Sequence, residues 1–229
     1  MTIFRYALLR GLRTPLSLIC TCILPLVFLF VRPFWTDGNM NGISFIMLFL
    51  MSGAYLMSLS ILTDKADGAV IRILAAPITT RRYLIENLLA CMVPLVAQTA
   101  LISLLGMALH GWSLALSFAL FLCYTVLILA SVAMAFTWHC IFKRKESSAT
   151  GFSLLLFLTA FLGGATFPVE AFPGILQYIG AIFPAYWAIR GLESFIENGA
   201  MTATYWLSIG ALLLFTAAFL LYGGKRRIV

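Results

Sequence analysis

Charged residues are scarce in this sequence, and six long apolar runs have none near their centres. Lys, Arg, Asp and Glu make up 10% of the 229 residues, whereas apolar residues make up 62%. A soluble domain contains roughly 45–50% apolar residues, and a soluble core of this length could not bury the excess. Lipid can solvate apolar surface, so the sequence predicts an integral membrane protein. Runs of this length span a bilayer as α-helices, which makes the expected fold class all-α.

The usual motifs of an enzyme or an ion-coupled transporter are also missing. Gly-Lys occurs only at Gly224–Lys225, where Arg226 replaces the Ser or Thr of a Walker sequence, so the chain cannot bind ATP by that route. The stretch Gly151–Leu155 lacks the second Gly of G-x-S-x-G, and H-E-x-x-H is absent. Ion-coupled transport normally places an ionisable residue in mid-membrane. These absences predict no catalytic residue and disfavour a secondary transporter.

Few polar side chains in the apolar runs suggest a site. Adjacent His139 and Cys140 would need two further ligands to hold zinc, and none is spaced nearby, so we predict no metal site. His139 is expected to be an interfacial side chain at the inner end of its run. The five cysteines lie within or at the ends of apolar runs and are expected to be buried thiols rather than disulfides. Gln98 predicts an interhelical hydrogen bond, and a polar position on a transport pathway is the alternative.

The basic residues orient the chain. Thirteen of the fifteen Lys and Arg residues fall at one end of the apolar runs, and only Arg32 and Arg190 fall at the other. Loops rich in Lys and Arg stay in the cytoplasm, so both termini should be cytoplasmic. This topology explains the net charge of +7 without a nucleic-acid partner, and anionic lipid head groups of the bilayer are the expected neighbours. The clusters are Arg5/Arg10/Arg13, Lys65/Arg72/Arg81/Arg82, Lys143/Arg144/Lys145 and Lys225/Arg226/Arg227.

The predicted architecture is one membrane domain over residues 1–229. Residues 1–14 are expected to form an amphipathic elbow helix in the cytoplasmic interface, with Phe4, Leu8 and Leu12 along one face. Each apolar run is long enough to cross a bilayer, which takes about 20 residues. Six transmembrane helices are expected at about residues 15–31, 43–62, 84–109, 113–136, 149–166 and 202–222.

Residues 167–199, before the last span, are too apolar for a free outer loop. Prolines at 168, 173 and 184 interrupt them, and the ten residues between the last two would cover about 15 Å as a helix. That is about half the bilayer core of roughly 30 Å. Broken backbone at membrane depth must be buried against protein. We therefore predict two short re-entrant helices in the outer leaflet, over 173–183 and 185–196.

The first inner loop, residues 63–83, carries an amphipathic pattern. Thr63 can cap a helix, and Asp64 and Asp67 would lie in its first turns, where the helix dipole favours acids. An apolar stripe follows, and Pro77 ends the pattern. The pattern fits a passive interfacial helix or a helix that docks on a soluble partner, and the residues alone leave both open.

This loop resembles the corresponding loop of ABC-2 type permeases, the membrane subunits of ATP-binding-cassette exporters. That family reads roughly E-R-E-x-G-T-L-E-x-L-x-x-x-P after its second span. Residues 64–77 here read D-K-A-D-G-A-V-I-R-I-L-A-A-P, which keeps the Gly and the Pro, has Leu74 next to the position of the second Leu, and departs at Ala66 and Ala69. The resemblance implies an ATPase-coupling helix made by Asp64, Lys65, Asp67, Gly68, Val70, Arg72, Leu74 and Pro77.

A second segment is similar to the same family. Permeases of this type have F-P, a Pro, an L-Q pair and then L-P-x-x-Y or a near variant before the last span. The resemblance covers the whole chain and implies an outer gate in the re-entrant segment. The matching residues are Phe167, Pro168, Pro173, Leu176, Gln177, Phe183, Pro184 and Tyr186.

The resemblance implies a permease subunit of an ATP-driven exporter in a bacterial-type cytoplasmic membrane. Its partners would be separate ABC ATPase subunits, which bind the ATP and Mg, and a second permease that is a copy or a paralogue. No cofactor is expected in this chain, and it would be no enzyme by itself. Spans without charges favour an amphiphilic substrate, such as a drug, an antimicrobial peptide or a lipid-linked molecule. A polysaccharide or polymer exporter, an ATPase-coupled mechanotransmitter and a membrane-embedded enzyme are the alternatives.

Overall fold

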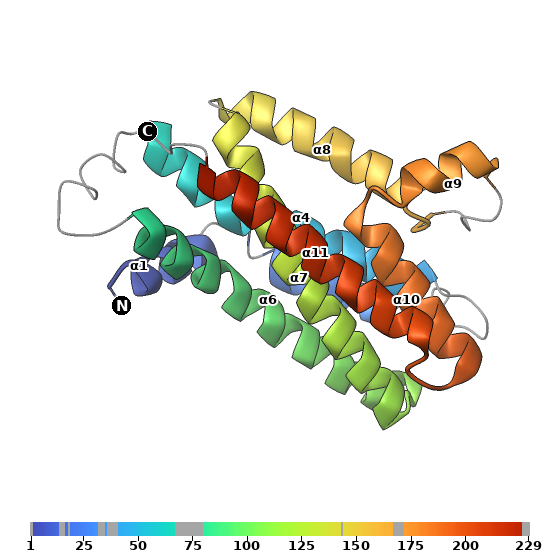
Figure 1. The fold of residues 1–229 in the computed structure, drawn as a ribbon. Coiled ribbons are helices and arrows are strands. Elements are labelled where there is room, and N and C mark those ends of the chain that lie inside the picture. The colour runs from blue at the N-terminus through green and yellow to red at the C-terminus, as the bar shows by residue number, and fades with distance from the viewer. Residues whose placement is uncertain are drawn as a thin grey trace.

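A computed structural model describes residues 2–13, 17, 19–31, 35, 41–66, 80–142, 144–166 and 172–225 of the chain. All regular structure in these residues is helical (Figure 1). The elements are α1 Thr2–Arg13, the π-helical η1 Ile19–Ile23, α3 Leu24–Leu29, α4 Asn41–Ala66, α6 Thr80–His110, α7 Leu114–Ile141, α8 Lys145–Leu162, α9 Gly174–Gly180, α10 Pro184–Asn198 and α11 Ala203–Lys225.

Helix α7 is the centre of the bundle. Its residues are apolar on every face, the pattern of a helix surrounded by other helices. It packs against α4, α6, α10 and α11, and α11 lies along it in Figure 1. Two buried tyrosine hydroxyls form hydrogen bonds across these contacts. Tyr124 donates to the carbonyl of Ile43 at 2.8 Å, and Tyr205 donates to the carbonyl of Ala119 at 2.8 Å. Such bonds satisfy polar atoms that lipid cannot.

Four of the described helices are long and apolar enough to cross a membrane: Gly42–Asp64, Ile85–His110, Leu114–Ile141 and Ala203–Gly223. They correspond to the second, third, fourth and sixth predicted spans. Among the described residues, the first predicted span consists of η1 and α3, with Pro25 in the first turn of α3. The fifth predicted span is α8, whose 18 residues begin with Lys145 and Glu146. The count of six therefore stays a prediction.

Several predicted boundaries shift because helices continue into the charged segments between the apolar runs. Helix α4 runs to Ala66 and α6 starts at Thr80, so the connection between them is shorter than residues 63–83. The prediction that Thr63 caps a new helix is wrong. Thr63 lies inside α4 and its hydroxyl donates to the carbonyl of Leu59 at 3.2 Å. The helix can continue because the next residue, Asp64, has partners on other helices.

Two short helices, α9 and α10, precede the last span. Pro184 occupies the first turn of α10, where its missing N–H costs nothing, and Gly199 ends that helix with φ 68°. The break at Pro184 is thus where the sequence predicted it, while the depth of the pair in a bilayer stays a prediction. Helix α10 is buried against α7 and α11, whereas on α9 Ile175 is 76% and Tyr178 is 81% exposed.

Candidate functional site

The first element of the site is α1, which packs on α4 and α6. Phe4 and Leu8 are half-buried, as the predicted apolar stripe requires, and the side chain of Leu12 lies outside the described residues. Gly11 is buried against Met57 of α4, where a Cβ atom would lie 2.9 Å from the Met57 methyl carbon. That contact allows α1 to approach α4 closely enough for side-chain bonds to form between them.

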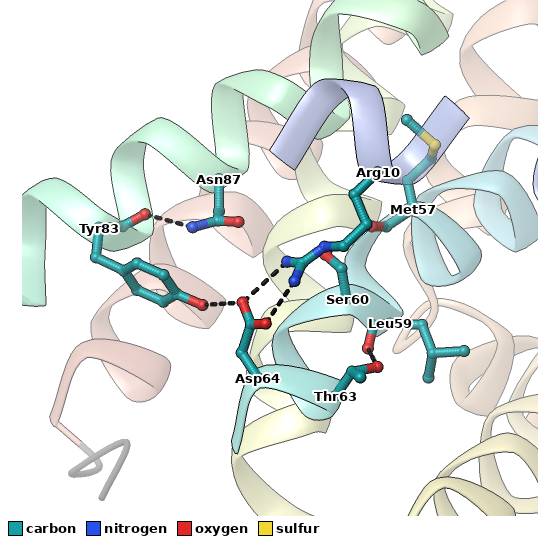
Figure 2. Close-up of polar contacts among 8 residues, drawn as sticks. All are labelled: Arg10, Met57, Leu59, Ser60, Thr63, Asp64, Tyr83 and Asn87. Atoms are coloured by element: carbon teal, nitrogen blue, oxygen red, sulfur yellow. Dashed lines mark hydrogen bonds and ion pairs between the residues drawn. The ribbon is translucent and has the colours of Figure 1, made fainter. Parts of the chain in front are cut away.

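A buried carboxylate joins α1, α4 and α6 (Figure 2). The two terminal guanidinium nitrogens of Arg10, Nη1 and Nη2, donate to the Asp64 carboxylate, and the Nη2 to Oδ2 distance is 2.9 Å. The Tyr83 hydroxyl donates to the same Oδ2 at 2.9 Å. A bidentate arginine pair is among the stronger hydrogen-bonded arrangements. Asp64 is therefore held from two sides by residues 54 and 19 positions away in the sequence.

Burial and the neighbouring groups raise the pKa of two members of this cluster, Arg10 and Tyr83. Asp64 is only 7% exposed, so its charge needs the Arg10 guanidinium as a counter-ion. The hydrogen bond to Asp64 in turn raises the pKa of Arg10. Burial, and then the Asp64 charge, raise the pKa of Tyr83 well above its usual value. Tyr83 consequently remains a protonated donor at neutral pH.

A second carboxylate fixes the other end of α1. Glu86 of α6 accepts the backbone N–H of Phe4 at 3.0 Å and an N–H of Arg82 at 2.9 Å. The N–H groups of a first helical turn have no partner inside the helix and carry partial positive charge, so a carboxylate there is favourable. Helix α1 is thus tied to α6 near its start by Glu86 and to α4 near its end by Asp64.

One of the predicted coupling residues, Asp64, belongs to this cluster. Asp64 lies near the C-terminal end of α4, and Lys65 follows it in the same helix, although the Lys65 side chain lies outside the described residues. The other predicted coupling residues also lie outside them: Asp67, Gly68, Val70, Arg72, Leu74 and Pro77. The described helices reach both ends of this segment, at Ala66 and at Thr80.

The predicted outer-gate residues are partly placed. Phe167 and Pro168 lie outside the described residues. Pro173 precedes α9, whose Leu176 is half-buried and whose Gln177 amide donates to the carbonyl of Phe172 at 2.9 Å. Phe183 and Pro184 start α10.

The Tyr186 side chain bonds within its own helix. Its hydroxyl accepts a hydrogen bond from Arg190 at 2.8 Å, and the Arg190 guanidinium lies 5.9 Å from the Tyr186 ring centroid. Near that tyrosine, the ends of α8, α9 and α10 meet. A Cβ on Gly180 would lie 2.4 Å from the carbonyl oxygen of Leu162, and one on Gly163 would lie 3.5 Å from the Tyr186 nitrogen.

Two polar side chains behave differently from the expectation. Gln98 is 3% exposed, but among the described residues neither amide atom has a hydrogen-bond partner, so the predicted interhelical bond is not formed there. His139 is fully buried rather than interfacial, and it contacts serines of α4 and α8. In the sequence, Ser58 and Ser148 are the residues that could have indicated partners for His139, because a polar side chain in an apolar segment needs a partner.

Long apolar helices and a charged cluster that joins three elements at one end of them indicate a multi-pass membrane protein. A comparison with protein families matches residues 35–224 to the model described as ABC-2 family transporter protein. The chain therefore belongs to the ABC-2 family of transporter proteins, whose members are membrane components of ABC transporters. A search of curated proteins finds no match.

Proposed function

We propose that this chain is the permease subunit of an ATP-driven exporter and works with separate ABC ATPase subunits. Its substrate would be amphiphilic, such as a drug, an antimicrobial peptide or a lipid-linked molecule, and would leave the cytoplasm or inner leaflet. A second permease, a copy or a paralogue, would complete the pathway in a bacterial-type cytoplasmic membrane. Both termini would be cytoplasmic.

The observation that carries this proposal is the position of Asp64. The segment that resembles the family's coupling helix starts in the last turn of α4 and leads into α6 at Thr80. Because Tyr83 and Arg10 both bind Asp64, the two ends of that segment and α1 are bonded to one another. A partner that pushes on residues 67–79 would therefore displace α1, α4 and α6 together.

The outer aromatic residues favour this proposal over polymer export. A polymer exporter tends to have a wide channel lined by free aromatic rings. Here the Trp35 and Trp112 ring centroids lie 5.4 Å apart, and Trp35 lies 5.2 Å from His110. These rings pack on one another at the turn between α6 and α7, so they serve to hold the outer ends of helices. The alternatives that remain are a mechanotransmitter coupled to the same kind of ATPase and, with less support, a membrane-embedded enzyme.

Co-purification tests the proposal directly. The tagged chain is purified from its own cells in mild detergent, and associated subunits are identified by sequence. We expect a stoichiometric soluble subunit that contains a Walker motif and hydrolyses ATP. A chain that purifies without such a subunit under conditions that keep it folded and monodisperse would contradict the proposal.

A further inference from the structure

We propose that His139 is a positioning residue that fixes the inner end of α8 to α4 and α7, so that α8 links the inner end of the bundle to the outer helices α9 and α10. The group is separate from the Arg10–Asp64–Tyr83 cluster, and all of its members are described residues. It comprises Tyr55 and Ser58 of α4, His139 of α7 and Ser148 of α8.

The four residues close a ring of hydrogen bonds. The Tyr55 hydroxyl lies 3.1 Å from the Ser148 oxygen, and the Ser148 oxygen lies 3.4 Å from Nδ1 of His139. On the other side, Nε2 of His139 lies 3.0 Å from the Ser58 oxygen. The Ser58 hydroxyl donates to the main-chain carbonyl of Tyr55 at 2.8 Å, which returns the ring to its first residue.

The ring has only one arrangement of hydrogens that makes every bond with a neutral imidazole. The Tyr55 carbonyl can only accept, so the single Ser58 hydrogen points to it, and Ser58 must accept from Nε2–H of His139. With its hydrogen on Nε2, the neutral imidazole accepts at Nδ1, so Ser148 donates there and accepts from Tyr55. A full set of directed bonds is expected in an apolar interior, where an unmade bond is costly.

Aromatic packing adds to the hold on this end of α8. Phe152 of α8 stacks on Tyr55, with ring centroids 4.2 Å apart and planes at 17°. The Trp138 indole donates to the carbonyl of Ser148 at 3.1 Å, and a Cβ on Gly151 would lie 2.9 Å from the Trp138 ring. The first two turns of α8 are thus clamped between α4 and α7.

The rest of α8 is held mainly at its far end. Its buried residues are Ser148, Phe152 and Thr159, whereas Phe157 is 65% exposed. At the end of the helix, the Leu162 carbonyl packs on Gly180 of α9, as described above. Figure 1 shows α8 at the margin of the bundle, reaching from the inner end of α7 to α9. Between these ends, Leu155, Leu156 and Ala160 are partly buried against the core. A continuous helix held in this way can transmit displacement from one end to the other.

The link to transport rests on the proposed function. Helix α4 carries both Asp64 and the ring residue Ser58, six residues apart, which is about 9 Å along a helix. Movement of the inner end of α4 would therefore reach α8 through the ring, and α9 and α10 through α8.

The first arm of the test reads the imidazole directly. The chain has two histidines, so His110→Gln leaves His139 as the only one. Nitrogen-15 spectra of this variant, labelled at histidine and held in lipid nanodiscs, should show a neutral ring with its proton on Nε2. Ser148→Ala should change the Nδ1 signal and Ser58→Ala the Nε2 signal. A proton on Nδ1, or nitrogen signals that neither serine substitution changes, would overturn the proposal.

The second arm measures the position of α8. Spin labels are placed at Phe157→Cys and Leu104→Cys, two exposed sites on α8 and α6, in a background without native cysteines. One narrow distance distribution is expected, which Ser148→Ala broadens or shifts and Ser148→Thr, with its hydroxyl kept, restores. Ser131→Ala is the matched control, because that buried serine of α7 donates to the carbonyl of Leu127 in its own helix.

Equal distributions for Ser148→Ala and Ser131→Ala would overturn the proposal. Both arms use the chain alone, so they judge the ring even where no ATPase subunit co-purifies and the proposed function fails. With the assembled complex, ATP should change the distance between the α8 label and a label at Tyr178→Cys, and Ser148→Ala should abolish that change. An ATP-driven change that survives Ser148→Ala would reject the link through α8 while leaving the exporter proposal intact.

Discussion

At the scale of single residues, polar side chains in apolar surroundings are stabilised by pairing with one another. Asp64 was singled out from the sequence as part of a coupling motif. Its partners Arg10 and Tyr83 could not be predicted, because the arginine lies 54 residues away and nothing in a local pattern indicates that distance. The sequence predicts His139 at the interface, whereas the side chain is buried. Its serine partners belong to other helices, which a local pattern does not indicate.

Asp64→Asn tests the pair at this scale. The change keeps the shape of the side chain but removes the charge that Arg10 binds. Hydrogen bonds to charged groups contribute about 1.5–3 kcal/mol, so thermal unfolding in nanodiscs should occur at a lower temperature. Hydrogen exchange of the α1 amides should also accelerate.

Glu146→Gln is the matched control for that change. Glu146 lies exposed in the first turn of α8, and its replacement should alter stability by less than about 0.5 kcal/mol. Equal effects of the two substitutions would mean that the Asp64 pair contributes nothing beyond a surface charge.

At the scale of elements, the sequence located most helices correctly and misplaced their ends. Apolar run length predicted the helices now seen as α4, α6, α7 and α11, because length and composition suffice for a span. Pro184 predicted the break before α10. The ends moved where charged residues such as Asp64 and Glu86 found partners on α1, which only the packed structure reveals.

Gly106→Ala tests the contact between α6 and the turn that follows it. A Cβ at this position would lie 2.0 Å from the Trp112 ring, which is too close for any real contact. The ring must move away from Trp35 and His110, at a cost of about 1–3 kcal/mol for an overpacked site. Thermal unfolding and the fluorescence of the tryptophans measure this change.

Gly210→Ala provides the comparison within α11. Among the described residues, no atom lies within 4 Å of a Cβ at position 210, so the substitution should be neutral or stabilise the helix by up to about 1 kcal/mol. A loss of stability as large as that of Gly106→Ala would show that the aromatic cluster is not what makes position 106 sensitive.

At the scale of the whole molecule, the distribution of basic residues predicts the orientation of the chain in the membrane. Single cysteines at Ser147→Cys and Asn198→Cys, both exposed sites, are introduced into a cysteine-free chain. An impermeant thiol reagent applied to intact cells should label position 198 and leave position 147 unlabelled until the cells are opened. The opposite pattern would reverse the predicted topology.

The central claim is that residues 64–77 couple an ATPase to this membrane bundle. The most direct measurement is substrate-stimulated ATP hydrolysis by the complex reconstituted in lipid, with the wild-type chain and with Leu74→Asp. A charge in the apolar stripe predicted for this segment should weaken capture of the ATPase or abolish the stimulation, while the variant still inserts and its α1, α4 and α6 amides keep their protection from exchange. Full capture and full stimulation by Leu74→Asp would contradict the account and leave the segment a passive interfacial helix.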